Sequence, residues 1–314
     1  MKYGFGVDLG GTTVKLAFFD REGNALDKWE IPTRTENNGS FILPDIAQAV
    51  DTYLKEKEIS KTEVIGIGIG VPGPVHADGT VNRCINLGWG VFNVEKTLES
   101  LTGLPVKAGN DANVAALGEC WKGGGQGCEN MVMATLGTGV GGGIIIGGKI
   151  VPGAHGAGGE IGHLVLNREE TESCGCGKCG CVEQYCSATG IVRLAKKHLE
   201  STDAPSSLRG FENLTCKDIF DEAAAGDEEA KAVLRQVYAY MGEFLANISC
   251  VADPEVIVLG GGVSKAGQPL LDGVQKAFVP RVFHACRQTK FALATLGNDA
   301  GVCGAFKLIL DEMG

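Results

Sequence analysis

The sequence predicts an α/β protein of two lobes, and three observations carry this prediction. Strand-forming runs joined by glycine turns occur at the start of the chain and again in its middle. Segments of helical periodicity separate these runs. The 314 residues, of which 44% are hydrophobic, suffice for two hydrophobic cores. We therefore expect each lobe to present a glycine hairpin to one central cleft.

The first half of the chain begins with a β-meander. Residues 3–9, 13–19 and 25–31 are rich in strand formers and are separated by tight turns. Apolar residues then recur at helical spacing over residues 41–58, where Pro44 suits a first helical turn. The remaining elements expected here are buried strands at 64–71 and 104–108 and a helix that follows residue 111.

The second half of the chain repeats the strand–turn–strand pattern. Residues 131–150 echo the first hairpin, and a helix is expected to end near residue 199. A polar, linker-like stretch follows. The later elements are expected to be a long helix over 227–250, a strand from 255 that enters three glycines and a helix, and a capped helix over 298–310.

Charge and apolar patterning exclude several classes of protein. The net charge is −10 and no long Lys/Arg cluster occurs, which argues against a nucleic-acid partner. The start MKYGFGVDLGG lacks the charged and apolar regions of a signal peptide, and no apolar run is long enough for a bilayer. We expect a cytoplasmic protein with no membrane partner and with reduced thiols.

Three glycine segments are candidate phosphate-binding loops: DLGGTTVK (8–15), LGTGVGGG (136–143) and LGGGVS (259–264). Glycine lets backbone N–H groups approach phosphate oxygens. Thr12, Thr13 and Thr138 add hydroxyl donors, and Lys15 adds a positive charge. Asp8, just before the first glycine pair, suits a contact with hydrated Mg²⁺, although a turn acceptor is the alternative.

Two familiar phosphate motifs fail on their context. Gly137, Gly139 and Gly142 satisfy GxGxxG, but a strand follows where a dinucleotide-binding fold needs a helix. The P-loop pattern is nearly met at Gly143 to Lys149, yet isoleucine 150 stands where a Mg²⁺-binding Ser or Thr belongs.

Two Asn-Asp pairs are candidates for a general base. Asn110-Asp111 and Asn298-Asp299 each follow a glycine and precede a helix, so both could be helix N-caps. Capping is the better interpretation for the second pair. The first pair follows a strand directly, at the end where a cleft opens in an α/β lobe. Asp111 therefore suits the carboxylate that accepts a hydroxyl proton during phosphoryl transfer.

The stretch CGCGKCGCVEQ (174–184) places four cysteines within eight residues. Disulfides are unfavourable in a reducing compartment, whereas an iron–sulfur cluster and a zinc site both remain possible. His163 precedes the cluster and favours a Cys₃His zinc site with Cys174, Cys176 and Cys181. Spacing alone leaves Cys179 open as a replacement ligand, and His155 as a competing one.

These motifs together resemble the ROK family (repressors, open reading frames and kinases), nearly from end to end. DLGGTTVK, NDANVAALGE and LGTGVGGG are similar to its first phosphate loop, catalytic segment and second phosphate loop. GAGGEIGH followed by CGCGKCGCVEQ is similar to its sugar-and-zinc signature, the most specific of the matches. GIGIGVPGPV, LGGGVS and LGNDAGVCGA resemble its proline-glycine loop, adenosine loop and C-terminal closure.

The resemblance implies roles for particular residues. Asp111 would be the general base, and the zinc ligands would be His163, Cys174, Cys176 and Cys181. The sugar would be bound by Gly73, Asn86, Asn110, Asp111, Glu160, His163 and Glu183. ATP and Mg²⁺ would be bound by Asp8, Gly10, Gly11, Thr12, Thr13, Lys15, Thr138, Gly139, Gly261 and Gly262.

The same resemblance implies an actin-like ATPase (ribonuclease H-like) fold with a central nucleotide and sugar cleft. The expected lobes are residues 1–112 with 300–314, and residues 113–299 carrying the zinc site. The implied activity is ATP-dependent phosphorylation of a hexose, glucose first, by a homodimer or homotetramer. N-acetylmannosamine, fructose or allose as substrate, polyphosphate as donor, a sugar-sensing repressor and an iron–sulfur or chaperone-like ATPase are the alternatives.

Overall fold

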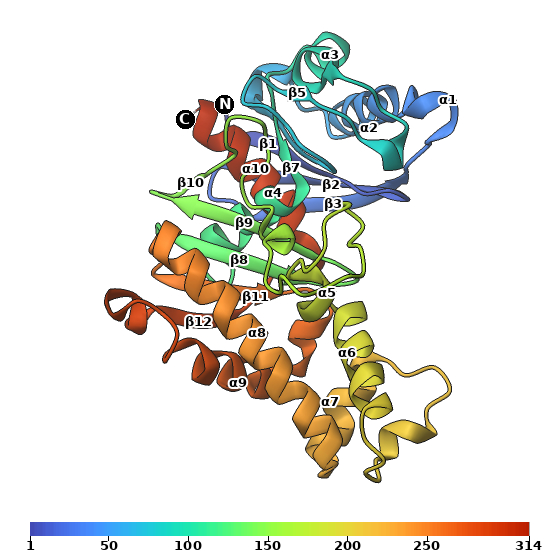
Figure 1. Ribbon diagram of the computed structural model, residues 1–314. Helices are drawn as coiled ribbons and strands as arrows, with labels where there is room; N and C mark the ends of the chain where they lie inside the picture. The colour runs from blue at the N-terminus through green and yellow to red at the C-terminus, as the bar shows by residue number, and fades with distance from the viewer. Residues whose placement is uncertain (314) are drawn as a thin grey trace. The chain divides into compact units, whose positions relative to one another are not determined.

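The computed structural model describes residues 1–313, and its first sheet has five strands in the order β3-β2-β1-β4-β7 (Figure 1). The strands are β1 (Tyr3–Leu9), β2 (Thr13–Asp20), β3 (Ala25–Pro32), β4 (Val64–Val71) and β7 (Val106–Asn110). β1, β2 and β3 form the predicted antiparallel meander, whereas β4 and β7 run parallel to β1.

Burial explains why these segments form the sheet. All eight residues of β4 are buried, as expected for a parallel strand covered on both faces. Phe5 of β1 and Phe18 of β2 pack against Tyr53 of α2 (Ile42–Glu56), with ring centroids 5.9 and 4.9 Å from it. The predicted helix over residues 41–58 therefore covers one face of this sheet.

The second sheet repeats the plan of the first, in the order β10-β9-β8-β11-β12. Its strands are β8 (Met131–Leu136), β9 (Val140–Ile146), β10 (Lys149–Ile150), β11 (Val256–Gly260) and β12 (Lys290–Leu293). β11 runs parallel to β8 and to β12. Each sheet is thus a meander of consecutive strands extended by two parallel strands, and the predicted internal repeat is confirmed.

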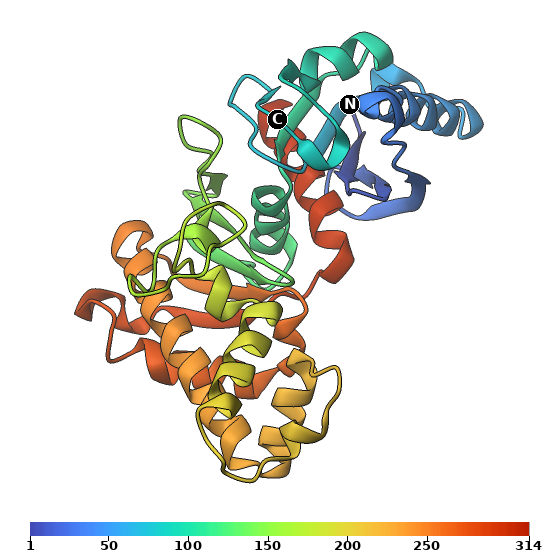
Figure 2. The same ribbon diagram turned by 45° about the vertical axis from the view of Figure 1, so that its right-hand side comes forward.

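Ten helices connect or cover these strands within the described residues 1–313 (Figures 1 and 2). Besides α2, they are α1 (Glu36–Gly39), α3 (Val94–Thr102), α4 (Asp111–Lys122), α5 (Glu183–Cys186), α6 (Ala188–Glu200), α7 (Cys216–Ala225), α8 (Glu228–Ala252), α9 (Gln268–Phe278) and α10 (Ala300–Met313). None of those long enough to span a bilayer has the apolar character to do so.

Among the elements that were not predicted are helices α1, α3 and α7 and strand β12. The short pair β5 (Thr80–Val81) and β6 (Phe92–Asn93) was not predicted either. The stretch expected to be linker-like contains a 3₁₀ turn at Ser207–Gly210 and leads into α7. A capping box between Thr215 and Asp218 starts that helix, and Ile219 and Ala223 are its buried residues.

Contacts divide the chain into two compact units. The first unit comprises Met1–Gly127, Gly143–Gly159 and the segment from Leu296, and the second comprises Cys128–Gly142 and Glu160–Thr295. This division assigns α4 to the first unit because α4 packs against α10, as Figures 1 and 2 show. The predicted lobes, with boundaries at residues 112 and 300, remain a prediction. Gly314, the last residue of the first predicted lobe, lies outside the described residues.

Helix α10 lies unusually close to the first sheet, because glycines face it. A Cβ atom at Gly6 of β1 would lie 2.0 Å from the carbonyl oxygen of Val302. At Gly68 of β4 it would lie 1.6 Å from the carbonyl oxygen of Ala305. Both obstacles are backbone atoms, which a rotamer change cannot move, so these positions admit only glycine.

We expect Gly68→Ala to lower the free energy of unfolding by about 3 kcal/mol or more, because the helix must move away from the sheet. Thermal and urea denaturation measure the change. Gly90→Ala is the matched control, since no atom lies within 4 Å of a Cβ at Gly90. A Gly68→Ala protein as stable as the Gly90→Ala protein would contradict the close packing of α10.

Candidate functional site

The candidate base lies where β7 ends and α4 begins. Asn110 is the N-cap of α4, since its side-chain oxygen accepts the N–H of Asn113 at 3.1 Å. The amide group of Asn110 donates to the carbonyl oxygen of Gly73 at 3.1 Å and to Oδ1 of Asp111 at 3.0 Å. Oδ1 of Asp111 also accepts the N–H of Ala112 at 2.8 Å. Three of the predicted sugar residues therefore form one hydrogen-bonded group.

The first glycine loop joins β1 to β2, with Asp8 and Lys15 opposite each other in the antiparallel register. Burial raises the pKa of Asp8, and the positive charge of Lys15 opposes that shift. The loop is closed by the N–H of Gly10, which donates to the carbonyl oxygen of Thr13 at 3.0 Å. Thr12 is exposed, so its hydroxyl group is accessible from solvent.

The second and third glycine loops lie against each other in the second unit. A Cβ atom at Gly261 would lie 2.5 Å from the carbonyl oxygen of Leu136. The hydroxyl group of Thr189 donates to the carbonyl oxygen of Thr138 at 2.7 Å and ties the second loop to α6. Gly262 and Thr138 are both exposed. The second unit thus presents two adjacent loops, each with an exposed residue.

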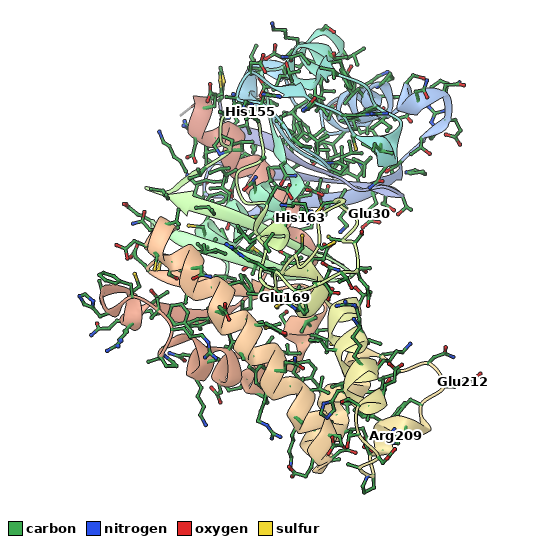
Figure 3. All side chains as sticks on the ribbon, in the orientation of Figure 1. Glu30, His155, His163, Glu169, Arg209 and Glu212 are labelled. Carbon is green, nitrogen blue, oxygen red and sulfur yellow. The ribbon has the colours of Figure 1, made fainter. Side chains whose placement is uncertain are left out.

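The predicted metal ligands come together in the second unit. The ligand atoms of His163, Cys174, Cys176 and Cys181 all lie within 4.8 Å of one another, and the described residues contain no other such group of His, Cys, Asp and Glu. Figure 3 shows the labelled His163 on the segment between β10 and α5. Cys179 lies outside the group, where its thiol contacts the carbonyl oxygen of Thr171 at 3.7 Å.

The spacing of these atoms fits a tetrahedral zinc ion. Zinc–sulfur bonds of about 2.3 Å in a tetrahedron place two sulfur atoms roughly 3.8 Å apart. Cys176 Sγ and Cys181 Sγ are 3.6 Å apart, and Cys174 Sγ is 3.8 Å from Nδ1 of His163. The geometry therefore offers Nδ1 to the metal and leaves Nε2 facing the carboxylate of Glu160, at 4.0 Å.

The thiols of this cluster differ in their pKa. Burial raises the pKa of Cys174 and raises that of Cys181 to about 12. The backbone N–H of Lys178 lowers the pKa of Cys176. Zinc binds thiolates, so binding of zinc to these thiols would release protons.

Glu183 connects the cysteine cluster to the second glycine loop. Its Oε2 accepts the N–H of Val140 at 3.0 Å, and its Oε1 lies 3.6 Å from Cys174 Sγ. A Cβ atom at Gly139 would lie 2.2 Å from Oε2, so that glycine leaves the space for the carboxylate. Sequence reasoning identified Glu183 and Gly139 separately, but not their contact.

A polar network fixes the loop that carries the cysteines. Gln184 accepts the N–H of Cys181 at 3.0 Å and donates to the carbonyl oxygen of Glu172 at 2.9 Å. Arg193 of α6 forms ion pairs with Glu172 and with Glu170. Burial disfavours the charged form of Glu170, but hydrogen bonds from Arg193, the backbone and a tyrosine outweigh burial and lower its pKa to about 2. Glu170 therefore stays charged near neutral pH.

The remaining predicted residues lie at exposed positions. Asn86 lies on a 3₁₀ turn, Ile85–Leu87, in the first unit. Glu160 directly precedes the turn that carries His163, and its side chain is exposed. His155, the competing ligand, is exposed and is not in the cysteine cluster.

Comparisons with known proteins agree with this arrangement. The ROK family model matches residues 4–312, and the chain belongs to the ROK family. It is 45% identical over 315 residues to a glucokinase of Halalkalibacterium halodurans, covering 98% of this chain and 94% of that protein.

Two solved structures resemble the chain over almost its whole length. A ROK family glucokinase from Streptomyces griseus in complex with glucose and AMPPNP has a TM-score of 0.73 and 34% identity, covering 98% of each chain. A ROK hexokinase from Thermus thermophilus has a TM-score of 0.79 and 31% identity, covering 97% of this chain and 96% of that one. The predicted α/β fold of the actin-like ATPase class is confirmed.

Proposed function

We propose that this chain is a glucokinase, an ATP:hexose 6-phosphotransferase that converts D-glucose and ATP to glucose 6-phosphate and ADP. The observation that carries the proposal is the Glu183 carboxylate, which contacts the cysteine cluster on one side and the second glycine loop on the other. One side chain thus connects a sugar-binding element to a phosphate-binding element. The glucokinase relatives described above support glucose as the sugar.

Asp111 is the general base of the proposed reaction. The group Gly73–Asn110–Asp111 is fixed by hydrogen bonds at the start of α4, so the carboxylate has little freedom to turn away. Asp111 takes the proton of the sugar 6-hydroxyl while that oxygen bonds to the γ-phosphorus of ATP. The bond between the γ-phosphorus and the bridging oxygen breaks, and ADP leaves with the electron pair.

Glu160, His163 and Glu183 bind sugar hydroxyls in this proposal, together with Asn110 and Asn86. His163, through Nδ1, and Cys174, Cys176 and Cys181 would hold a structural zinc ion. With Nδ1 held in this way, His163 would carry its hydrogen on Nε2 and donate it to a sugar hydroxyl. The zinc supplies no chemistry to the phosphoryl transfer itself.

The three glycine loops bind the nucleotide. Gly10, Gly11, Thr12, Thr13 and Lys15 in the first unit, and Thr138, Gly139, Gly261 and Gly262 in the second, supply N–H, hydroxyl and ammonium groups to the phosphates. Asp8 would hold hydrated Mg²⁺, which would supply positive charge to the phosphate oxygens. Burial raises the pKa of Asp8, and a bound cation would oppose that shift.

The test is ADP release with Mg-ATP and a panel of glucose, mannose, fructose, N-acetylglucosamine and N-acetylmannosamine. We expect kcat/KM for glucose to exceed that for every other sugar by at least about tenfold, because unpaired polar groups in a sugar site are costly. Preference for another sugar would leave the kinase assignment in place and overturn the substrate. No turnover on any sugar by zinc-loaded, folded protein would favour a sugar-sensing regulator.

We also propose that the protein acts in the cytoplasm as a homodimer or homotetramer. The twelve cysteines are all free, which suits a reducing compartment. Val251 at the end of α8 is 86% exposed and Phe283 is 55% exposed, and such apolar side chains suit a subunit contact. Light scattering after size-exclusion chromatography measures the subunit number.

A further inference from the structure

Glu119 is a charged side chain with no exposed surface, and the proposed reaction does not use it. It lies near the end of α4, with an exposed fraction of 0%. Burying a carboxylate is costly unless hydrogen bonds replace its water. Here Oε2 accepts the N–H of Gly124 and Oε1 accepts the N–H of Leu296, each at 2.8 Å. The backbone carbonyl of Glu119 also accepts the N–H groups of Gly123 and Gly125.

Gly124 and Leu296, two partners of this carboxylate, lie close to places where the chain passes from one unit to the other. The chain leaves the first unit after Gly127, shortly beyond Gly124, and returns to it at Leu296. The first of these crossings is unusually rich in glycine, with the sequence GGGQG over residues 123–127. Such a segment has high backbone freedom unless other groups hold it. Hydrogen bonds to Glu119 restrain both the glycine-rich crossing and the last crossing.

The other two crossings also contact α4. The chain re-enters the first unit at Gly143, where a Cβ atom would lie 2.4 Å from Cβ of Ala116. It leaves again after Gly159, next to Gly158, whose carbonyl oxygen accepts a hydrogen bond from Nδ2 of Asn113 at 2.9 Å. All four crossings in the described residues therefore contact one helix, and the first residue of that helix is Asp111.

We propose that Glu119 is a positioning residue that fixes the chain crossings on the helix that carries the general base. Any movement of one unit relative to the other has to pass through the crossings. The carboxylate of Glu119 accepts one charge-assisted hydrogen bond from each of two crossings, and these bonds hold both crossings at a constant place along α4. Glu119 acts through this geometry and touches neither sugar nor nucleotide. The inference rests on the proposed kinase activity.

The test compares Glu119→Gln and Glu119→Asp with the unchanged protein. Glutamine keeps the size of the side chain but presents an NH₂ group to one of the two N–H donors, and aspartate is too short to reach both. We expect kcat to fall about 10- to 100-fold, the range that misplacement by about 1 Å produces. The KM for Mg-ATP should change less than about threefold, because Glu119 is not among the residues proposed to bind the nucleotide.

A second readout does not depend on activity. Hydrogen exchange at residues 123–127 and 295–297 should become faster in both variants, because the acceptors of Gly124 and Leu296 are weakened. Thr102→Val is the matched control. Thr102 is buried in the first unit and forms hydrogen bonds with Leu98 and Leu104, so its loss should lower Tm but leave kcat and exchange at the crossings unchanged.

Three outcomes would overturn the proposal. The first is an unchanged kcat in Glu119→Gln. The second is an unchanged rate of hydrogen exchange at both crossings. The third is a fall in kcat that Thr102→Val also shows when its Tm is lowered by the same amount. If the unchanged protein phosphorylates no sugar, the proposed function fails, yet the exchange measurement still decides whether Glu119 holds the crossings. Faster exchange confined to the crossings would support the positioning role in that case as well.

Discussion

Asp111→Asn is expected to bind glucose nearly as well as the unchanged protein and to lose almost all turnover. The asparagine oxygen can still accept the N–H of Ala112, so the start of α4 should keep its shape. What is lost is the group that takes the hydroxyl proton, an effect of about 10²- to 10⁴-fold on kcat. Calorimetry with glucose and steady-state ADP release measure the two quantities separately.

The chain offers a close control for this substitution. Asp299 also follows a Gly-Asn pair and also precedes a helix, but it forms an exposed ion pair with Lys28. Asp299→Asn should therefore leave kcat and KM unchanged, because exposed ion pairs contribute little. Turnover close to normal in Asp111→Asn would remove Asp111 from the mechanism.

The purified protein is expected to contain about one zinc per chain, and Cys181→Ala is expected to abolish it. Cys181 is fully buried and lies 3.6 Å from Cys176 Sγ, so its loss opens the cluster. Without the metal, His163 is no longer joined to the cysteines that precede α5. We expect a lower Tm and a rise of about 10- to 100-fold in the KM for glucose. Mass spectrometry of the metal content and thermal denaturation are the measurements.

Cys179→Ala is the control, because its thiol contacts Thr171 rather than the cluster. It should retain its zinc and its KM for glucose. Loss of zinc in Cys179→Ala would mean that Cys179 replaces one of the four ligands. A brown protein that contains iron and no zinc would overturn the zinc site and favour an iron–sulfur cluster.

The sequence predicts the candidate site best where its residues are neighbours in the chain. Asn110 is the last residue of β7 and Asp111 directly follows it, and the end of a strand can be predicted from the local sequence. The four cysteines lie within eight residues, and three of them lie close to His163 in the structure. In each case the role of the residues can be predicted with little knowledge of how distant segments pack.

Tertiary contacts explain what the sequence did not predict. Glu119 bonds to Leu296, a residue 177 positions away, and nothing local indicates that pairing. The available signal was a glutamate within the otherwise apolar and small run NVAALGEC. Helix α7 was not predicted because the polar stretch before it suggested a linker. Strand β12 was not predicted because four residues are too few to show a clear periodicity.

The matching strand orders of the two sheets have an evolutionary consequence. Two copies of one ancestral half would give this arrangement. In the first copy β3 leads through α1 to α2, whereas in the second β10 leads into the segment that holds His163 and the cysteines. An insertion at that junction leaves the order of both sheets intact. The duplicated scaffold is thereby inherited unchanged, whatever segment that junction carries.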